Sequence, residues 1–245
     1  MEPALVPGCT GVLVAGGRAA RMGGAPKGLL RVGGEPIAAR SIALFRRIFG
    51  AALVVANDPA PYAGLGAPIV GDVHRDRGAP GGLHAALAAA TTPWVFAAGC
   101  DMPFLETRAI TFLAERRAGV DAVLVRFRGR LEPLHAFWSR ACLPALESLL
   151  AAGEPSLRDL AAAVRARIVE EDEWRVVDPE GRALENANTP GDARRRGLEP
   201  AAASPAPGYA PRHPREDIAM DLAGYLKDNE ARYVSELVEF LKIPS

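Results

Sequence analysis

The sequence lacks several features that would assign it to a secreted or membrane class of protein. It has three cysteines, Cys9, Cys100 and Cys142, which form neither a Cys-x-x-Cys pair nor a zinc-type spacing. Free thiols in a reducing compartment are therefore expected, which favours the cytoplasm. No uninterrupted apolar run reaches the ~18 residues that a membrane-spanning helix needs. The N-terminus has no basic region ahead of an apolar stretch, so no signal peptide is expected.

The sequence also has a formal net charge of zero and no internal repeats. The 29 basic and 29 acidic residues cancel, which disfavours a broad basic surface for nucleic acid or an anionic membrane. An anionic ligand must then be bound by a local cluster of charge. The composition, 49% hydrophobic and 24% charged, is typical of a globular protein, and 245 residues suffice for one well-buried domain with an extension.

Short apolar runs alternate with helical patterns along the first two hundred residues. Strands are predicted at residues 11–15, 51–56, 68–71, 94–98 and 121–126, and helices at residues 37–49, 82–90 and 107–118. This alternation predicts a three-layer α/β fold, with a mainly parallel sheet covered by helices on both faces. Ligand chemistry is then expected at the carboxyl ends of the strands.

Composition changes near residue 199 and divides the chain. We expect one domain over residues 1–199 and a linker rich in proline and alanine over residues 200–216. Residues 217–245 have apolar side chains near a 3.6-residue period, which predicts an amphipathic helix.

The loop after the first predicted strand carries the strongest chemical signal. Gly16 and Gly17 end the strand, and Arg18, Arg21 and Lys27 follow them. Glycines let backbone N–H groups approach an anion, and two or three cations at fixed spacing neutralise a triphosphate. The spacing is neither that of a Walker loop nor that of the dinucleotide fingerprint. The competing interpretation is an ordinary glycine-rich turn with solvated arginines.

The order Ala15-Gly-Gly, Arg21-Met-Gly, Lys27 resembles the signature loop of the NTP-transferase superfamily, with Val14 where the family usually has leucine. These are nucleotidyltransferases of Rossmann-like α/β/α fold that act on sugar phosphates, polyols and pterins. Further segments resemble the molybdenum-cofactor guanylyltransferase branch, so that the resemblance spans residue 11 to about residue 196. One of these segments is the strand end at Asn57. Another is Asp72 together with a glycine segment at residues 78–83, whose spacing is shifted from that of the family. The others are residues 99–104, 132–136 and 185–190.

The resemblance implies a reaction and a set of site residues. An acceptor phosphate oxygen attacks the α-phosphorus of the NTP and pyrophosphate leaves, so positioning and charge stabilisation can suffice. A strand-end carboxylate would hold Mg²⁺, whose remaining positions are filled by phosphate oxygens and water. The implied catalytic residues are Arg21, Lys27 and Asp101, with Asp101 as metal ligand, and the implied nucleotide-binding residues are Val14, Ala15, Gly16, Gly17, Lys27, Asn57, Asp72 and Asp101.

Several of these residues also have simpler interpretations. Asp101 taken alone is better explained as the N-cap of a following helix. Asp72 suits a turn as well as a second acid near the nucleotide. Asn57 suits both recognition of a purine edge and an Asn-Asp-Pro turn. Asn186 and Asn188 either contact the acceptor or satisfy loop backbone.

The histidines are scattered and form no catalytic or metal triad. One of them, His135, lies in the segment at residues 132–136, and we expect it to make an orienting hydrogen bond within the sheet rather than to contact an acceptor.

The resemblance implies GMP transfer from GTP to molybdenum-bound molybdopterin, which gives the guanine dinucleotide cofactor, with Mg²⁺ and with transient complexes with proteins that deliver or receive the cofactor. Cytidylyl transfer to molybdopterin, nucleotidyl transfer to a sugar or polyol phosphate, and nucleotide binding without turnover remain open. Residues 220–245 resemble the first helix of an M20-type metallopeptidase but contain no His/Asp metal ligand set, so no peptidase activity is expected.

Overall fold

The computed structural model describes residues 5–15, 21–22, 25–74 and 76–200, and all of them fall within one of the two structural units of the chain, Met1–Ala203. The predicted helix at residues 217–245 and nearly all of the predicted linker lie outside this part of the chain. Gly16, Gly17 and Arg18 of the glycine-rich loop also lie outside it.

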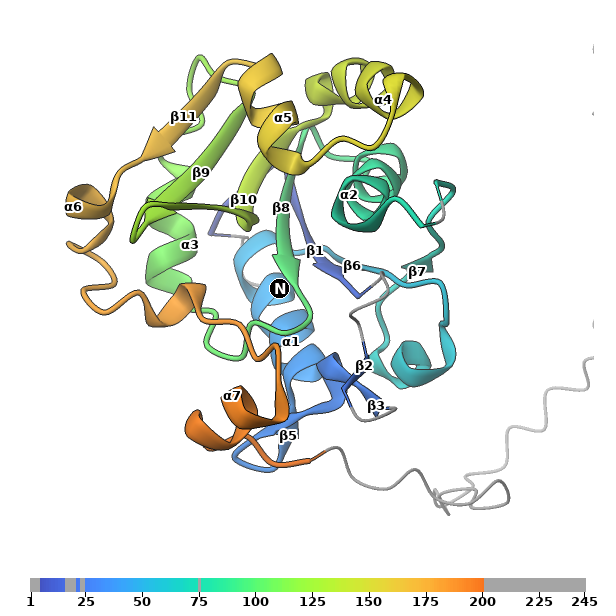
Figure 1. Cartoon of the computed structure of the whole chain (residues 1–245), viewed down its shortest axis with the longest axis vertical. Coiled ribbons are helices and arrows are strands. Elements are labelled where there is room, and N and C mark those ends of the chain that lie inside the picture. Colours follow the sequence, from blue (N-terminus) through green and yellow to red (C-terminus); the bar gives the residue numbers. More distant parts are fainter. Residues whose placement is uncertain (1–4, 16–20, 23–24, 75, 201–245) are drawn as a thin grey trace, which may run out of the picture. The chain divides into compact units, whose positions relative to one another are not determined.

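A seven-stranded sheet lies at the centre of the described residues (Figure 1). Its order is β11-β9-β10-β8-β1-β6-β7, and every neighbouring pair is parallel except those of β10, which runs antiparallel to β8 and β9. The predicted α/β fold with a mainly parallel sheet is confirmed. The strands are β1 (Cys9–Val14), β6 (Ala52–Val55), β7 (Ile69–Val70), β8 (Trp94–Gly99), β9 (Ala122–Phe127), β10 (Arg130–Ser139) and β11 (Ala166–Val169).

Helices cover both faces of this sheet. On one face lie α1 (Ile37–Phe49), α3 (Thr107–Ala114) and α6 (Glu171–Trp174). On the other lie α2 (Gly78–Ala89), α4 (Leu143–Ala152) and α5 (Leu157–Ala163). The remaining pieces are the hairpin strands β2 (Arg21–Met22), β3 (Ala25–Pro26), β4 (Arg31–Val32) and β5 (Glu35–Pro36), the 3₁₀ turns η1 (Lys27–Leu29), η2 (Ala60–Leu65), η3 (Arg140–Cys142) and η4 (Arg182–Leu184), and α7 (Pro190–Arg195). In Figure 1, β2, β3, β5 and α7 gather at the end of the molecule toward which the arrowhead of β8 points.

Helix α1 has the bounds that its apolar spacing predicts. It ends at Gly50, whose left-handed φ of 73° allows its N–H to donate to the carbonyl of Arg46 at 2.9 Å. The helix packs closely on β1, because a Cβ at Gly11 would lie 2.4 Å from two side-chain atoms of Phe45. Glycine at position 11 therefore fixes how closely the first helix approaches the first strand.

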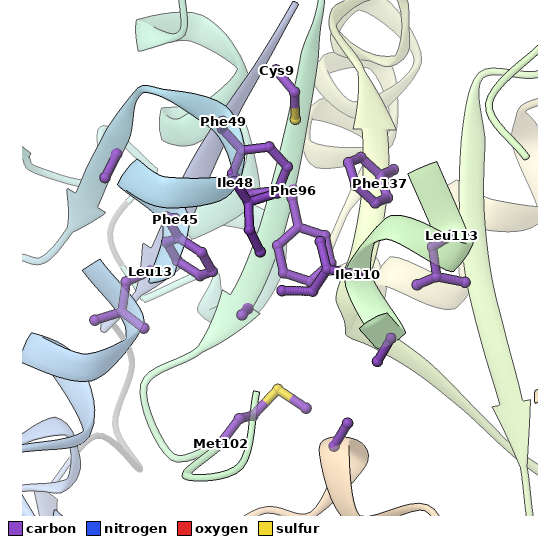
Figure 2. Packing of buried hydrophobic residues seen from close by; sticks show 14 of the residues in the cluster. Cys9, Leu13, Phe45, Ile48, Phe49, Phe96, Met102, Ile110, Leu113 and Phe137 are labelled. Carbon is purple, nitrogen blue, oxygen red and sulfur yellow. The ribbon is translucent and has the colours of Figure 1, made fainter. Parts of the chain in front are cut away.

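Aromatic side chains fill the core between α1 and the sheet (Figure 2). Phe96 on β8 lies 5.8 Å, ring centroid to ring centroid, from both Phe45 and Phe49, and 4.9 Å from Phe137 on β10. Each fully buried side chain of this kind stabilises the fold by about 1.5–3 kcal/mol. This core holds β1 and β8 in fixed register, and it therefore also fixes the positions of their carboxyl ends.

The last described segment folds back against the loop that follows Lys27. Arg31 and Glu199 exchange two backbone hydrogen bonds, with N···O distances of 3.0 and 2.9 Å. A small apolar cluster joins the two segments, formed by Leu30, Ile37, Ala187, Ala193 and Leu198. Residues close to the C-terminal end of the described domain are thereby placed beside its first loop.

Among the described residues, no helix combines the length and the apolar character that crossing a membrane requires. The three cysteines are buried and free.

Candidate active site

Strand β1 lies between β6 and β8, and the carboxyl ends of the three strands form the edge at which the site is built. Val14 pairs with Val55 on one side and with Gly99 on the other. The register continues past the strand ends, because the N–H of Ala15 donates to Val55 at 2.8 Å. Asn57 and Asp101 each follow their strand by two residues, so the sheet places one on either side of β1.

Lys27 and Asp101 meet at this edge. The Nζ atom of Lys27 lies 3.2 Å from Oδ2 of Asp101, and the two side chains are 5% and 20% exposed. Lys27 opens the turn η1, and Asp101 follows β8. The convergence of a loop cation with a strand-end carboxylate, which the sequence predicts, is present in the structure.

Asn188 completes this cluster from a distant part of the chain. Its Oδ1 accepts a hydrogen bond from Nζ of Lys27 at 2.9 Å. The preceding residue, Ala187, donates its N–H to the carbonyl of Asp101 at 2.8 Å. The motif at residues 185–190 therefore contacts both charged residues, a relationship that its residue types alone do not reveal. Asn186 instead donates its amide to the carbonyl of Leu184 at 3.2 Å, as expected of a residue that satisfies loop backbone.

Asp101 does not cap a helix. The next helix, α3, begins at Thr107 and has Glu106 as its N-cap. Asp101 lies instead in a turn in which Met102 donates to the carbonyl of Gly99 at 3.2 Å. A Cβ at Gly99 would lie 2.7 Å from Oδ1 of Asp101, so the glycine makes room for the carboxylate.

Asn57 and Asp72 join the ends of β6 and β7. The N–H of Asp72 donates to Oδ1 of Asn57 at 2.8 Å, while the adjacent Asp58 accepts a turn hydrogen bond from Ala60 at 3.3 Å. The carboxylate of Asp72 is buried against the first turns of α2, where a Cβ at Gly81 would lie 2.5 Å from its Oδ2. The amide oxygen of Asn57 is thus already engaged in holding the loop.

The other predicted residues of the first loop are placed only in part. Gly16 and Gly17 lie outside the described residues, as does the side chain of Arg21, whose backbone pairs with Pro26 in the hairpin directly before Lys27. The side chain of Val14 is buried, and a Cβ at Gly82 of α2 would lie 2.8 Å from it. Val14 therefore turns its side chain into the core, and only its backbone faces the edge.

Two buried residues lie behind the cluster. Burial, together with the neighbouring Asp101 carboxylate, raises the pKa of the Cys100 thiol to about 12. The thiol stays protonated near neutral pH, which excludes it as a thiolate nucleophile. Tyr62 packs against the backbone beside Lys27, since a Cβ at Gly28 would lie 3.1 Å from its ring. Tyr62 was not predicted from the sequence, because an aromatic residue in a turn carries no sign of its distant contact.

His135 plays a different part from the one expected. Its ring is fully buried between Phe96 and Trp174, with centroid separations of 5.2 and 5.5 Å. Neither ring nitrogen has a hydrogen-bond partner on another of the described residues, so the expected orienting hydrogen bond to a neighbouring part of the sheet is wrong. Burial lowers the pKa of His135 to about 4, an effect that the charge of Asp178 partly opposes.

The donor set at this edge suits a metal ion that keeps most of its water. Among the described residues, no three His, Cys, Asp or Glu side chains cluster as a complete metal site. Asp101 offers one carboxylate, which already has a cation, the Lys27 ammonium, at 3.2 Å. Mg²⁺ commonly binds through one or two carboxylates together with substrate phosphates and water, so the residues present fit it.

Known proteins with similar sequences match about three quarters of the chain. Residues 11–170 match the family described as the MobA-like NTP transferase domain. A probable molybdenum cofactor guanylyltransferase of Pelotomaculum thermopropionicum is 33% identical over 183 residues, which cover 75% of this chain and 89% of that protein. A molybdenum cofactor guanylyltransferase of Desulfosudis oleivorans is 32% identical over 181 residues, which cover 74% and 90%.

Solved structures share the fold. Molybdopterin-guanine dinucleotide biosynthesis protein A of Archaeoglobus fulgidus superposes with a TM-score of 0.64 at 24% identity, over 76% of this chain and 95% of that one. The 2-C-methyl-D-erythritol 4-phosphate cytidylyltransferase of Thermus thermophilus gives a TM-score of 0.53 at 19% identity, over 75% and 95%. At these identities the likeness shows the fold alone, an α/β architecture with a mainly parallel sheet.

Proposed function

The chain belongs to the MobA-like NTP transferase family, and from that premise we propose that it transfers GMP from GTP to molybdenum-bound molybdopterin. The products are the molybdopterin guanine dinucleotide cofactor and pyrophosphate. The relatives that are named for this guanylyltransferase reaction match over three quarters of the chain. The proposal places the reaction in the cytoplasm, where GTP is abundant.

One observation supports the reaction chemistry above all others, namely the contact of Lys27 with both Asp101 and Asn188. A buried ammonium and a strand-end carboxylate bring together the two kinds of charge that can bind a triphosphate and a divalent cation. The ammonium stabilises negative charge on the phosphates, and the carboxylate binds a divalent cation.

The proposed roles of Lys27 and Asp101 rest on this arrangement, and those of Arg21, Gly16 and Gly17 rest on the family resemblance of the first loop. Lys27 and Arg21 bind the β- and γ-phosphates and stabilise the departing pyrophosphate, while backbone N–H groups of Gly16 and Gly17 contact the phosphates. The N–H of Ala15, which the sequence also suggested for this role, is instead engaged by the carbonyl of Val55. The attacking acceptor oxygen is already an anion, so the chain needs to position it and need not deprotonate it. Asp101 would hold Mg²⁺, which supplies charge neutralisation at the phosphates when bound.

Base recognition is assigned to the loop after β6. Asn57 is exposed and carries an amide whose Oδ1 is fixed by the N–H of Asp72. That hydrogen bond orients the amide, and its NH₂ group can donate to an acceptor atom of guanine. Asp72 is proposed as the acid that shapes this loop beside the nucleotide.

Pyrophosphate release in the presence of molybdopterin acceptor tests the proposal. We expect turnover with GTP and Mg²⁺, and much slower turnover with CTP, ATP and UTP. A preference for CTP would assign the chain to cytidylyl transfer instead. Tight GTP binding without pyrophosphate release would show a nucleotide-binding module. Turnover with a sugar phosphate but not with molybdopterin would show that the acceptor is a sugar phosphate.

Partner proteins and the C-terminal segment are considered apart from the reaction. The product is a cofactor that other proteins use, so transient complexes with proteins that supply molybdopterin or accept the dinucleotide are proposed. The segment at residues 217–245 lies outside the described residues and receives no catalytic role.

A further inference from the structure

The ammonium of Lys27 lies where a metal ion at Asp101 would meet strong repulsion. Its Nζ is 3.2 Å from Oδ2 of Asp101, and Lys27 is only 4% exposed. Repulsion between two cations grows as their distance shortens and as water is excluded. A metal ion and the Lys27 ammonium in its present position therefore compete for one carboxylate.

Asn188 holds the ammonium in that position. Its Oδ1 accepts from Nζ of Lys27 at 2.9 Å. The backbone on both sides of Asn188 is fixed: Ala187 donates to the carbonyl of Asp101 at 2.8 Å, and Thr189 and Asp192 form a reciprocal capping box that starts α7. The amide oxygen of Asn188 is therefore held in a position to accept a hydrogen bond from the ammonium.

We propose that Lys27 is the resident counter-cation of Asp101, that Asn188 is the positioning residue that keeps it there, and that a metal-bound nucleotide displaces it. The identity of the displacing ligand rests on the proposed function. Phosphate groups offer Lys27 new anionic partners, and the released carboxylate becomes available to the metal. Once Lys27 and Asp101 separate, both charges are satisfied only when nucleotide and metal are bound together.

Positive coupling between metal and nucleotide follows from this exchange. Metal alone must bind against the charge of Lys27. Nucleotide alone would draw Lys27 away and leave the Asp101 carboxylate near the phosphates without a cation. The exchange therefore disfavours the site with only metal or only nucleotide bound. Asn188 determines how far the affinity for metal alone is lowered.

The test measures binding of Mn²⁺ alone to the full chain, from the electron paramagnetic resonance signal of the free ion. Wild type is compared with Lys27→Met and with Asn188→Ala. Arg40→Met removes one positive charge from α1, outside the site, and is the control for net charge. Asn186→Ala removes the amide two residues before Asn188 and is the control for the local segment.

We expect Lys27→Met to bind Mn²⁺ at least about tenfold more tightly than wild type, because a nearby like charge is lost. Asn188→Ala should tighten binding by about threefold, since loss of one hydrogen bond loosens Lys27. Both controls should match wild type, and adding Asp101→Asn to Lys27→Met should abolish the gain. We expect damage to the fold to weaken metal binding, so a gain in affinity separates loss of the Lys27 charge from such damage.

Equal Mn²⁺ affinity in wild type and Lys27→Met, or no binding to either, would overturn the exchange. If Lys27→Met does not fold, Lys27→Gln is measured instead, because its amide retains a donor for Asn188 while the charge is gone. Unchanged affinity in Asn188→Ala would remove Asn188 as the positioning residue. GTP turnover of wild type is measured separately, so failure of the guanylyltransferase function and failure of the exchange give different results.

Discussion

Lys27 and Asp101 are 74 residues apart in the sequence, yet their charged atoms lie 3.2 Å apart at the carboxyl edge of the sheet. Lys27 reaches this point through the hairpin that ends the first loop, and Asp101 through the register of β8 beside β1. This contact is the basis of the proposed site for a polyanion and a cation, and substitutions around it have distinct expected effects.

The first prediction concerns the carboxylate. Asp101→Asn keeps the size of the side chain and removes the charge that would bind a metal. We expect GTP turnover to fall by at least ~100-fold while the melting temperature changes little. Pyrophosphate release and thermal unfolding measure the two effects, and unchanged turnover would remove Asp101 from the reaction.

The second prediction concerns the room that Gly99 leaves for Asp101. In Gly99→Ala, the added methyl group would lie 2.7 Å from Oδ1 of Asp101, so the carboxylate must move. We expect turnover to fall by about tenfold or more, with a stability loss of about 1–3 kcal/mol. Gly64→Ala is the matched control, since a Cβ at that position would have no described neighbour within 4 Å. Equal activity of the two variants would show that the carboxylate's position is not critical.

The third prediction concerns base selectivity. Asn57→Ala should lower the preference for GTP over CTP by up to about tenfold, which is the value of one lost hydrogen bond. Catalysis with GTP should persist, because Lys27 and Asp101 are untouched. Asp58→Ala, which removes the neighbouring turn hydrogen bond to Ala60, controls for loosening of the loop. Equal loss with all four NTPs would argue against base recognition by Asn57.

The fourth prediction concerns stability at acid pH. The folded-state pKa of His135 is about 4, below the ordinary value of 6.5, because burial disfavours its charged form. The unfolded chain therefore takes up this proton first, and the free energy of unfolding should fall as pH falls from about 6.5 to about 4, by up to ~3 kcal/mol. Urea unfolding of wild type and His135→Leu at pH 7 and pH 4.5 measures this. An identical pH dependence in the two proteins would contradict the assignment.

Local sequence patterns predicted the parts of the fold that depend on local physics. Helix α1 has the predicted bounds at residues 37–49, because its apolar spacing and the glycine that follows act within one helix. The early strands appear within a few residues of their expected bounds. Strand β10 was not predicted, because Pro133 and the charged residues at its start interrupt the apolar pattern, and its register with β9 shifts after Glu132.

The site was predictable in its residue types and not in its contacts. A glycine-rich loop with Lys27 and a strand-end Asp101 could be read from spacing and from family resemblance. The hydrogen bond from Lys27 to Asn188 joins residues 161 positions apart and depends on how the last segment folds back. The same holds for His135, whose neighbours Phe96 and Trp174 come from a different strand and a short helix.

The most direct measurement is a crystal structure of the chain with a non-hydrolysable GTP analogue and Mg²⁺. We predict that Nζ of Lys27 has left Asp101 for a phosphate oxygen, and that the Asp101 carboxylate binds the metal. An analogue bound elsewhere, with the Lys27–Asp101 ion pair still closed, would contradict it.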